Sequence, residues 1–457
     1  MFSTATYVAR RAQLKKQMGS GLLLFLGNDD QGLHYEDNAF RYRQDSTFLY
    51  YFGISAAGLS AVIDVDNDRE IIFGDELTMD HIIWMGTQPT LSERSQEVGV
   101  GDTRPAAEIS AFLQQAQAQG QRVHFLPPYR AEHRIKLMEW LGLPLSVQEA
   151  SVPFIRAVVA QRSYKSAGEV AEIEKACDIT ADMHITAMRM IRPGMKEYEV
   201  VAAMEAVAVA AGGATSFPTI ATVNGQTLHN HYYGNTLRSG DLFLIDAGAE
   251  TAMGYAGDMS STVPVDKTFT TRQREIYEIQ NAMHQASVAA LRPGIPYEQV
   301  YDLSARVLVE GLRNLGLMKG SPEDAVREGA HALFYPHGLG HMMGLDVHDM
   351  ENLGEVWVGY DGHPKSTQFG RRSLRLARPL EAGFVITVEP GLYFIPELID
   401  LWRGENKLAG FINYEKVEAY KDFGGIRNEE DFLITETGAR RLGKKIPLTP
   451  EEVEALR

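Results

Sequence analysis

The sequence predicts a mixed α/β (α+β) protein. A small α/β domain at the N-terminus is followed by a larger, duplicated domain in which helices cover an antiparallel sheet. Three observations lead to this prediction. The 457 residues exceed what one compact core usually fills. Short strand-like runs alternate with helical stretches early in the chain. Further along, two similar helical segments accompany strand patterns that carry acidic residues.

The first predicted domain comprises residues 1–152. Its strand-like runs are "GLLLFLG", "LSAVIDVD" and "REIIFG", and its clearest helical stretch is "AAEISAFLQQAQAQ". The pattern changes around "EASVPFIRAVVAQRSYKSAGEV", where Ser166 can cap a helix together with Glu169 three residues later. We therefore place the second domain at residues 153–457.

The second domain contains an internal repeat. The segments "MIRPGMKEYEVVAAMEAV" and "ALRPGIPYEQVYDLSARVL" share an apolar residue, Arg-Pro-Gly, a Tyr-Glu pair and helical periodicity, and Arg192 and Arg292 lie 100 residues apart. Two repeats are too few for a solenoid, so they indicate a duplicated α/β half. Four strand patterns accompany them, each with an acid among apolar neighbours: "DLFLIDAGAE", "YAGDMSSTVPV", "FVITVEPGLYF" and "IRNEEDFLIT". This arrangement predicts carboxylates on the concave face of an antiparallel sheet.

Charge and cysteine content argue against several classes of function. The net charge of -16 repels nucleic acid and anionic membranes and attracts divalent cations. Cys177 is the only cysteine, which excludes an intramolecular disulfide and a thiolate-rich metal site; its helical surroundings indicate a small core residue. The apolar run Leu22–Leu26 is shorter than a secretory signal core of about 7 to 15 residues. We expect a cytoplasmic protein that binds neither nucleic acid nor membranes.

Asp246 and Asp258 flank a short connection. A hairpin turning about Ala252 would set them directly opposite, with Cβ atoms about 4.5 to 5.5 Å apart. Two ionised carboxylates at that distance need either a raised pKa or a cation between them. For an isolated aspartate pair, turn or surface positions are the more ordinary interpretation.

Further acids and histidines in the sequence favour a metal site over surface positions for the two aspartates. Glu389 and Glu429 also lie in strand patterns, and "HGLGHMMGLDVHD" supplies His337, His341 and His348. Acids are seldom buried unless they are paired or bound to metal. Four carboxylates and one neutral imidazole would balance two divalent cations. Ligation mostly by oxygen favours manganese, or cobalt in vitro, over a structural zinc site built from thiolates. The first two histidines flank Gly-Leu-Gly without a glutamate, which excludes the single-zinc helix motif.

Taken together, these motifs resemble those of the pita-bread metallopeptidases, which include methionine aminopeptidase, aminopeptidase P and prolidase. The resemblance covers essentially the whole chain. It implies a dinuclear site in which Asp258 and Glu429 contact both metals, with five ligands: Asp246, Asp258, His341, Glu389 and Glu429. Two departures affect only the local register. The span between the aspartates looks one residue longer than usual, and Asn428 stands where a β-branched apolar residue is common.

The resemblance also implies roles for other residues. His229 and His348 match histidines that hold the scissile carbonyl, His337 lines the pocket, and Arg427 orients a carboxylate or joins a hydrogen-bond relay. Glu389 is our candidate for general base and acid. The remaining histidines of the chain that we considered are interpreted as structural: His231, His81, His124 and His133.

The implied reaction is hydrolysis of the bond before a proline by a metal-activated water. In "GRRSLRLARPLEAG", Arg375 matches the arginine with which prolidases bind a terminal carboxylate, and this favours a dipeptidase. Aminopeptidase P, which acts on longer peptides, is the alternative. The less favoured interpretation of Arg372, Arg375 and Arg378 is that they are solvated on a surface loop.

The resemblance further implies a homodimer built through the N-terminal domain, with Asp45 and Trp84 either shaping the pocket or serving as core or interface residues. Two rival functions belong to other classes. One is a non-catalytic peptide-binding protein of the same fold, and the other is a metal-free, creatinase-like hydrolase. Both would lack the five-ligand set.

Overall fold

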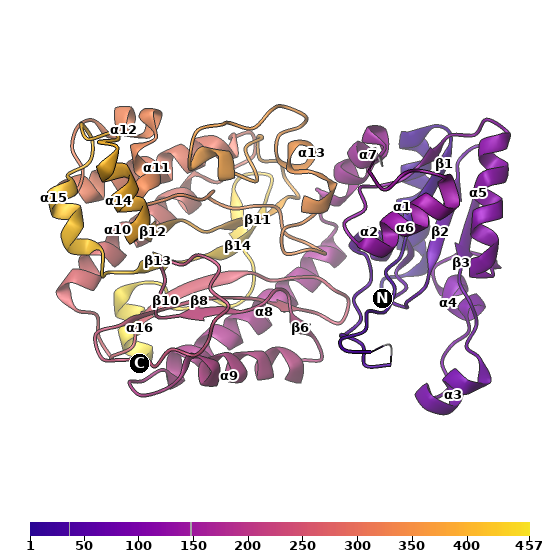
Figure 1. Ribbon diagram of the computed structural model, residues 1–457, viewed down its shortest axis with the longest axis horizontal. Coiled ribbons are helices and arrows are strands. Elements are labelled where there is room, and N and C mark those ends of the chain that lie inside the picture. Colours follow the sequence, from indigo (N-terminus) through magenta and orange to yellow (C-terminus); the bar gives the residue numbers. More distant parts are fainter. Residues whose placement is uncertain (36, 147–148) are drawn as a thin grey trace. The chain divides into compact units, whose positions relative to one another are not determined.

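The computed structural model describes residues 1–35, 37–146 and 149–457 (Figure 1). The chain forms two compact units. The first contains residues 1–162 and 350–357, and the second contains residues 163–349 and 358–457. The domain boundary near residue 152 remains a prediction.

The first unit is built on a five-stranded mixed sheet with strand order β4-β3-β2-β1-β5. The central strands β1 (Leu22–Leu26), β2 (Ser60–Asp64) and β3 (Arg69–Phe73) pair antiparallel, and they confirm the three predicted strands. Two short strands, β4 (Asp102–Arg104) and β5 (Val123–His124), pair parallel at the edges. The helices of this unit are α1 (Thr4–Met18), α2 (Ser46–Phe52), α3 (Met79–Met85), α4 (Leu91–Glu97), α5 (Ile109–Ala118), α6 (Ala131–Leu141) and α7 (Val152–Arg162).

Helices cover both faces of this sheet. Leu22, Val62 and Ile71 pack with Leu113 of α5 and Leu137 of α6 in one apolar cluster, because alternate strand residues point to the same face. On the other face, Phe25 contacts the rings of α2 and α7. Asp45 caps α2 by accepting the Phe48 N–H at 2.8 Å. Trp84 on α3 is 84% exposed, which excludes a core role for it.

The second unit confirms the predicted duplication. Helix α8 (Ala167–Met190) packs on α9 (Glu197–Ala210), and α10 (Thr271–Ala290) packs on α11 (Tyr297–Asn314). Each pair is joined by one of the Arg-Pro-Gly segments, in which Gly194 and Gly294 have φ of 93° and 83°. A side chain other than glycine is strained at such angles, which explains why both repeats carry glycine there. The predicted capping box of Ser166 and Glu169 begins α8.

The strands of this unit pair antiparallel, as predicted. Strand β8 (Leu242–Ala247) lies between β7 (Ile220–Thr222) and β10 (Met259–Pro264). The other pairings are β11 (Val385–Val388) with β14 (Glu430–Ile434), β14 with β15 (Ala439–Arg441), β12 (Gly391–Tyr393) with β13 (Gly425–Arg427), and β6 (Ala214–Thr215) with β9 (Ala249–Glu250). Figure 1 shows these strands flanked by α8 to α11.

The remaining helices are short: α12 (Pro322–Glu328), α13 (Glu355–Gly359), α14 (Pro396–Gly404), α15 (Tyr414–Val417) and α16 (Pro450–Leu456). In the part of the chain that the structure describes, no helix has both the length and the apolar character needed to cross a membrane.

Candidate active site

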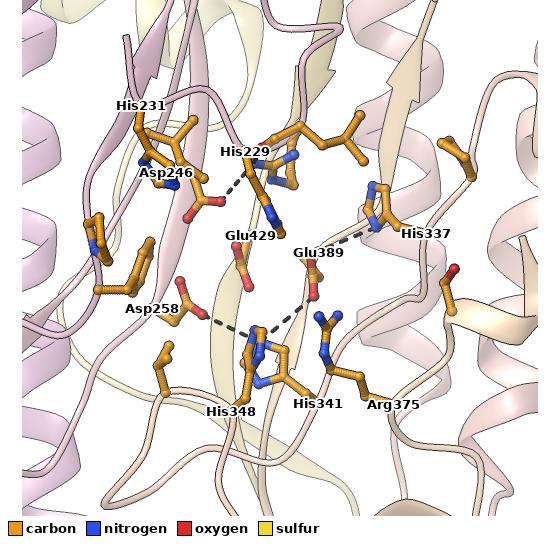
Figure 2. A pocket seen from close by; sticks show the side chains of 18 residues that line it. His229, His231, Asp246, Asp258, His337, His341, His348, Arg375, Glu389 and Glu429 are labelled. Carbon is orange, nitrogen blue, oxygen red and sulfur yellow. Dashed lines mark hydrogen bonds and ion pairs between the residues drawn. The ribbon is translucent and has the colours of Figure 1, made fainter. Parts of the chain in front are cut away.

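A cavity of about 530 Å³ opens in the second unit (Figure 2). The structure brings all ten predicted site residues to its wall: His229, Asp246, Asp258, His337, His341, His348, Arg375, Glu389, Arg427 and Glu429. They come from strands, strand ends and loops spread over about 200 residues of sequence, from 229 to 429. The roles assigned to them from the sequence remain predictions.

The two aspartates reach the cavity through a register that differs from the predicted one. Asp246 on β8 lies opposite Ser260 on β10, so the hairpin is centred on Met253 and not on Ala252. Moving the centre of a hairpin by one residue moves every cross-strand partner by two. Asp258 therefore lies diagonal to Asp246, directly before β10 begins. The shift is an even number of residues, so both carboxylates still face the same side.

The two glutamates also differ from prediction. Glu389 lies between β11 and β12, before Pro390, and Glu429 lies between β13 and β14, so neither is inside a strand. Their backbones are still fixed, because the Glu389 N–H donates to the Leu339 carbonyl at 2.8 Å and the Glu429 N–H donates to the Ser260 carbonyl at 2.9 Å. A break in the strand leaves each side chain directed into the cavity.

Three buried residues form a candidate metal-binding cluster: Asp258, His341 and Glu429, each with a ligand atom within 4.8 Å of the others. Asp258 Oδ2 lies 3.4 Å from His341 Nε2. Among the described residues, Asp258 Oδ1 has no hydrogen-bond partner although it is fully buried. Because a buried carboxylate oxygen without a donor is costly, this donor set fits a divalent cation. His341 Nδ1 lies 3.0 Å from the Met342 carbonyl, which assigns the proton to Nδ1 and directs the Nε2 lone pair toward Asp258.

Three carboxyl groups in the cavity have raised pKa values. Burial raises the pKa of Asp258 and of Glu429 well above their ordinary values, and the neighbouring carboxylates raise both further. Burial also raises the pKa of Glu389, although His341 and Arg427 oppose the shift. Without a cation, these side chains therefore resist being ionised together.

Arg427 contacts Asp246 and two further residues of the cavity region. Its Nη2 donates to Asp246 Oδ2 at 2.6 Å, its Nη1 donates to the Tyr393 hydroxyl at 2.7 Å, and its Nε donates to Ser260 Oγ at 3.1 Å. The Tyr393 hydroxyl in turn lies 2.9 Å from His337 Nε2. The guanidinium group is buried, so it orients Asp246 and links it to His337 through Tyr393. Ser260 also donates to Glu429 Oε2 at 2.7 Å, so a single strand position supports two carboxylates.

The three candidate substrate-handling histidines differ in environment. Burial and the nearby Arg427 lower the pKa of His337 to about 3, so its imidazole is neutral at pH 7. Burial lowers the pKa of His229 as well, and Arg427 adds to the effect. The ring of His348 packs edge-on against that of His341, with centroids 4.2 Å apart. A neutral imidazole can offer one N–H to a developing oxyanion without adding a full charge.

Of the three insert arginines, Arg375 alone lines this cavity. Arg372 is exposed and lies over the ring of Phe369, and Arg378 pairs with Glu381 at 2.7 Å. In Figure 2, Arg375 lies on the side of Glu389 and away from Asp246. The interpretation of the arginines as a solvated surface set therefore holds for Arg372 but not for Arg375.

His231, which the sequence analysis placed among structural histidines, also lines the cavity (Figure 2). Asn230 fixes the segment on which it lies, because its amide donates to Thr222 Oγ1 at 3.0 Å and accepts the Tyr232 N–H at 3.0 Å. The closeness of the two histidines in the sequence offered a signal that we did not use. His229 lies in a turn and His231 just after it, and both side chains reach the cavity from this short segment.

Two family models match the chain. The model of metallopeptidase family M24 matches residues 171–436, and that of the aminopeptidase P N-terminal domain matches residues 7–124. The chain is 30% identical over 448 residues to the Xaa-Pro dipeptidase of Homo sapiens, covering 96% of this chain and 89% of that protein. It is 32% identical over 472 residues to the Xaa-Pro aminopeptidase of Escherichia coli (strain K12), covering 99% and 98% respectively.

Solved structures of aminopeptidases P are similar to this chain as well. Aminopeptidase P from E. coli with the inhibitor Pro-Leu has a TM-score of 0.80 and 31% identity, covering all of this chain and 98% of that one. The aminopeptidase PepP of Pseudomonas aeruginosa has a TM-score of 0.81 and 27% identity, with the same coverage. These similarities confirm the predicted fold class and the resemblance drawn from the motifs. The chain belongs to metallopeptidase family M24 and is a metal-dependent peptidase.

Proposed function

We propose that the protein hydrolyses the Xaa-Pro bond of Xaa-Pro dipeptides. The observation that carries this proposal is the position of Arg375. This arginine lines the same cavity as the candidate metal-binding cluster and lies away from Asp246. A guanidinium group binds a carboxylate in a bidentate manner, so this end of the cavity suits a free C-terminus. Relatives at similar identity are named Xaa-Pro dipeptidase and Xaa-Pro aminopeptidase, so similarity alone does not choose between them.

The proposed site holds two divalent cations, preferably manganese, through Asp246, Asp258, His341, Glu389 and Glu429. The unpartnered oxygen of Asp258 and the raised pKa values of three of these acids support this ligand set. Oxygen ligands with a single imidazole suit manganese. Elemental analysis of protein saturated with manganese should give two equivalents per chain, and at most one equivalent with full activity would contradict the dinuclear assignment.

The residues around the cations divide the work of the reaction. Two divalent cations held by these residues would supply Lewis acidity, which polarises the scissile carbonyl and lowers the pKa of a water. Glu389 accepts the proton of that water and delivers it to the proline nitrogen, which leaves readily only when protonated. His229 and His348 donate N–H groups to the carbonyl oxygen as negative charge develops on it. Arg427 keeps Asp246 oriented through its 2.6 Å contact.

Comparing substrates of different length tests the proposal. The Arg375→Ala change removes one partner of a charge pair, which costs about 2 to 5 kcal/mol, so kcat/KM for an Xaa-Pro dipeptide should fall by more than about tenfold. The same variant should lose little on an Xaa-Pro-Xaa tripeptide or a C-terminal amide. Arg372→Ala, in the same insert but exposed, is the matched control.

Two results would favour the aminopeptidase alternative. One is a wild-type enzyme that prefers tripeptides. The other is an Arg375→Ala variant that impairs both substrate classes equally, because the arginine would then not distinguish a free carboxylate.

We also propose that the protein is a cytoplasmic homodimer. Helix α3 supports the dimer, because Met79, Ile83, Trp84 and Met85 expose between 68% and 84% of their surface on one short helix. An apolar group of this kind on a surface indicates a binding face. Light scattering should give twice the chain mass for the wild type and a lower mass for Ile83→Ser/Trp84→Ser. A monomeric wild type would contradict the dimer.

A further inference from the structure

One loop carries both a candidate metal ligand and a candidate catalytic histidine. It runs from His341 to Asp349 and closes on itself, because the Asp349 N–H donates to the Met342 carbonyl at 2.8 Å. The Met343 N–H donates to the Val385 carbonyl of β11 at 3.0 Å, which ties the start of the loop to the sheet. The placement of His348 therefore depends on how the end of this loop is held.

A buried ion pair holds that end. Lys165 Nζ lies 2.9 Å from Asp349 Oδ2, and both side chains are only 1% exposed. Asp349 Oδ1 accepts the Asp346 N–H at 3.3 Å, so the same carboxylate also shapes the turn before His348. The lysine is itself anchored, because its backbone N–H donates to the Gly383 carbonyl at 2.8 Å.

The pair packs directly against the loop backbone. A methyl group added at Gly344 would lie 2.7 Å from Asp349 Oδ2 and 2.8 Å from Lys165 Cε, distances that a real side chain does not tolerate. The loop backbone at Gly344 thus packs directly against both side chains of the ion pair. Asp349 directly follows His348, so a displacement of Asp349 would move the backbone that carries the histidine.

Stability alone does not explain such a pair. Removing two charges from water costs about as much as their attraction returns, and apolar residues of similar volume often serve as well or better. What an ion pair supplies and an apolar pair does not is a fixed position for the carboxylate and for the chain that bears it. Here the fixed carboxylate is that of Asp349, which directly follows His348, a residue to which we assign a role in the reaction.

We propose that Lys165 is a positioning residue for catalysis, which acts through Asp349 to fix His348 against the substrate carbonyl. The proposal rests on the proposed function, in which His348 stabilises the transition state. Small displacements of a catalytic group lower the rate steeply, with about 100-fold lost for about 1 Å.

The test uses Lys165→Met and the neutral pair Lys165→Met/Asp349→Leu in the full-length, manganese-saturated enzyme. For each variant, kcat and KM on an Xaa-Pro dipeptide, bound manganese and melting temperature are measured. We expect Lys165→Met to lower kcat by about 10- to 100-fold while KM and bound manganese stay unchanged. The neutral pair should recover the melting temperature but not kcat, and it carries the test if Lys165→Met does not fold. Lys175→Met, which removes an exposed lysine paired with Glu172 on α8, is the control and should change neither kcat nor bound manganese.

A double-mutant cycle identifies the residue through which Lys165 acts. In a His348→Ala background, Lys165→Met should have no further effect on kcat, because the group it positions is already absent. Equal losses in both backgrounds, a neutral pair with wild-type kcat, or loss of manganese from Lys165→Met would each overturn the proposal. A His348→Ala variant with wild-type kcat would instead refute the proposed role of His348, so the two failures are distinguishable.

Discussion

Replacing Asp258 by asparagine should separate the stability of the protein from its function. Asparagine has nearly the same shape as aspartate but carries no charge. In the metal-free protein, Asp258 is buried, its Oδ1 lacks a partner among the described residues, and burial raises its pKa, so this carboxyl group costs the fold free energy whether it stays ionised or takes up a proton. The amide of an asparagine can donate to His341 Nε2, which lies 3.4 Å from the present Oδ2. We therefore expect Asp258→Asn to stabilise the metal-free protein.

The expected magnitude follows from that unpartnered oxygen. A buried polar group without a partner costs about 1 to 3 kcal/mol, and a charged one costs more. Asp258→Asn should therefore raise the free energy of unfolding of the metal-free protein by at least about 1 kcal/mol, which corresponds to about 1.5 to 2 °C in melting temperature for a unit of this size. With manganese the order should reverse, because the wild type gains binding energy that the variant loses. Activity should fall by at least about 100-fold, since even residues supporting a ligand contribute 10- to 100-fold.

Thermal unfolding followed by circular dichroism, with EDTA and with saturating manganese, measures both effects. The reasoning requires that the two melting curves change order between the conditions. A metal-free Asp258→Asn protein that melts below the metal-free wild type would refute it, as would equal stabilisation of both proteins by manganese. Ser260→Ala removes a hydroxyl group bonded to Glu429 but no charge, so it is a suitable comparison. Its melting temperature should have the same order relative to the wild type with EDTA and with manganese.

Three further predictions concern other residues. His229→Ala and His348→Ala should each lower kcat by about 10²- to 10³-fold with unchanged bound manganese; loss of metal would make that histidine a ligand. Cys177 donates to a buried carboxylate and burial raises its pKa, so iodoacetamide should label it only as fast as the protein unfolds. Burial and Arg371 lower the pKa of His331 to about 3, so the unfolded chain binds a proton below pH 6.5 and the folded chain does not. Acidification from pH 6.5 to pH 5 should therefore cost about 2 kcal/mol of stability that His331→Gln does not lose; an identical pH dependence would contradict this.

The fold was predictable because its signals are local. The strand β1 is an uninterrupted apolar run, the start of α8 carries a capping box, and the two Arg-Pro-Gly segments lie at the same place in both helix pairs. Each of these patterns is decided by residues close together in the sequence, so they could be read without knowledge of the tertiary structure.

The candidate site was only partly predictable, because its geometry depends on pairing between distant segments. The centre of the β8–β10 hairpin is fixed by how the Gly248–Gly257 connection folds, and in the structure the Gly257 N–H donates to the Ala249 carbonyl at 2.9 Å. Pro390 is a local sign of the strand break at Glu389, whereas the residues beside Glu429 carry no such sign. The ion pair between Lys165 and Asp349 joins residues 184 positions apart, and no local pattern signals it.

The charges in the cavity connect metal binding to substrate choice. When all four are ionised, the carboxylates outnumber the guanidinium groups of Arg375 and Arg427 and leave a net negative wall, which opposes a substrate that has a free carboxylate. The two divalent cations proposed for this site would reverse that sign. The same acids that raise each other's pKa in the empty site would then lie beneath a positive surface, with Arg375 at the edge away from Asp246. Binding of an anionic dipeptide should therefore require metal, whereas binding of a C-terminal amide would depend on metal less. The metal-binding acids and Arg375 would then both contribute to the selection of substrates with a free carboxylate.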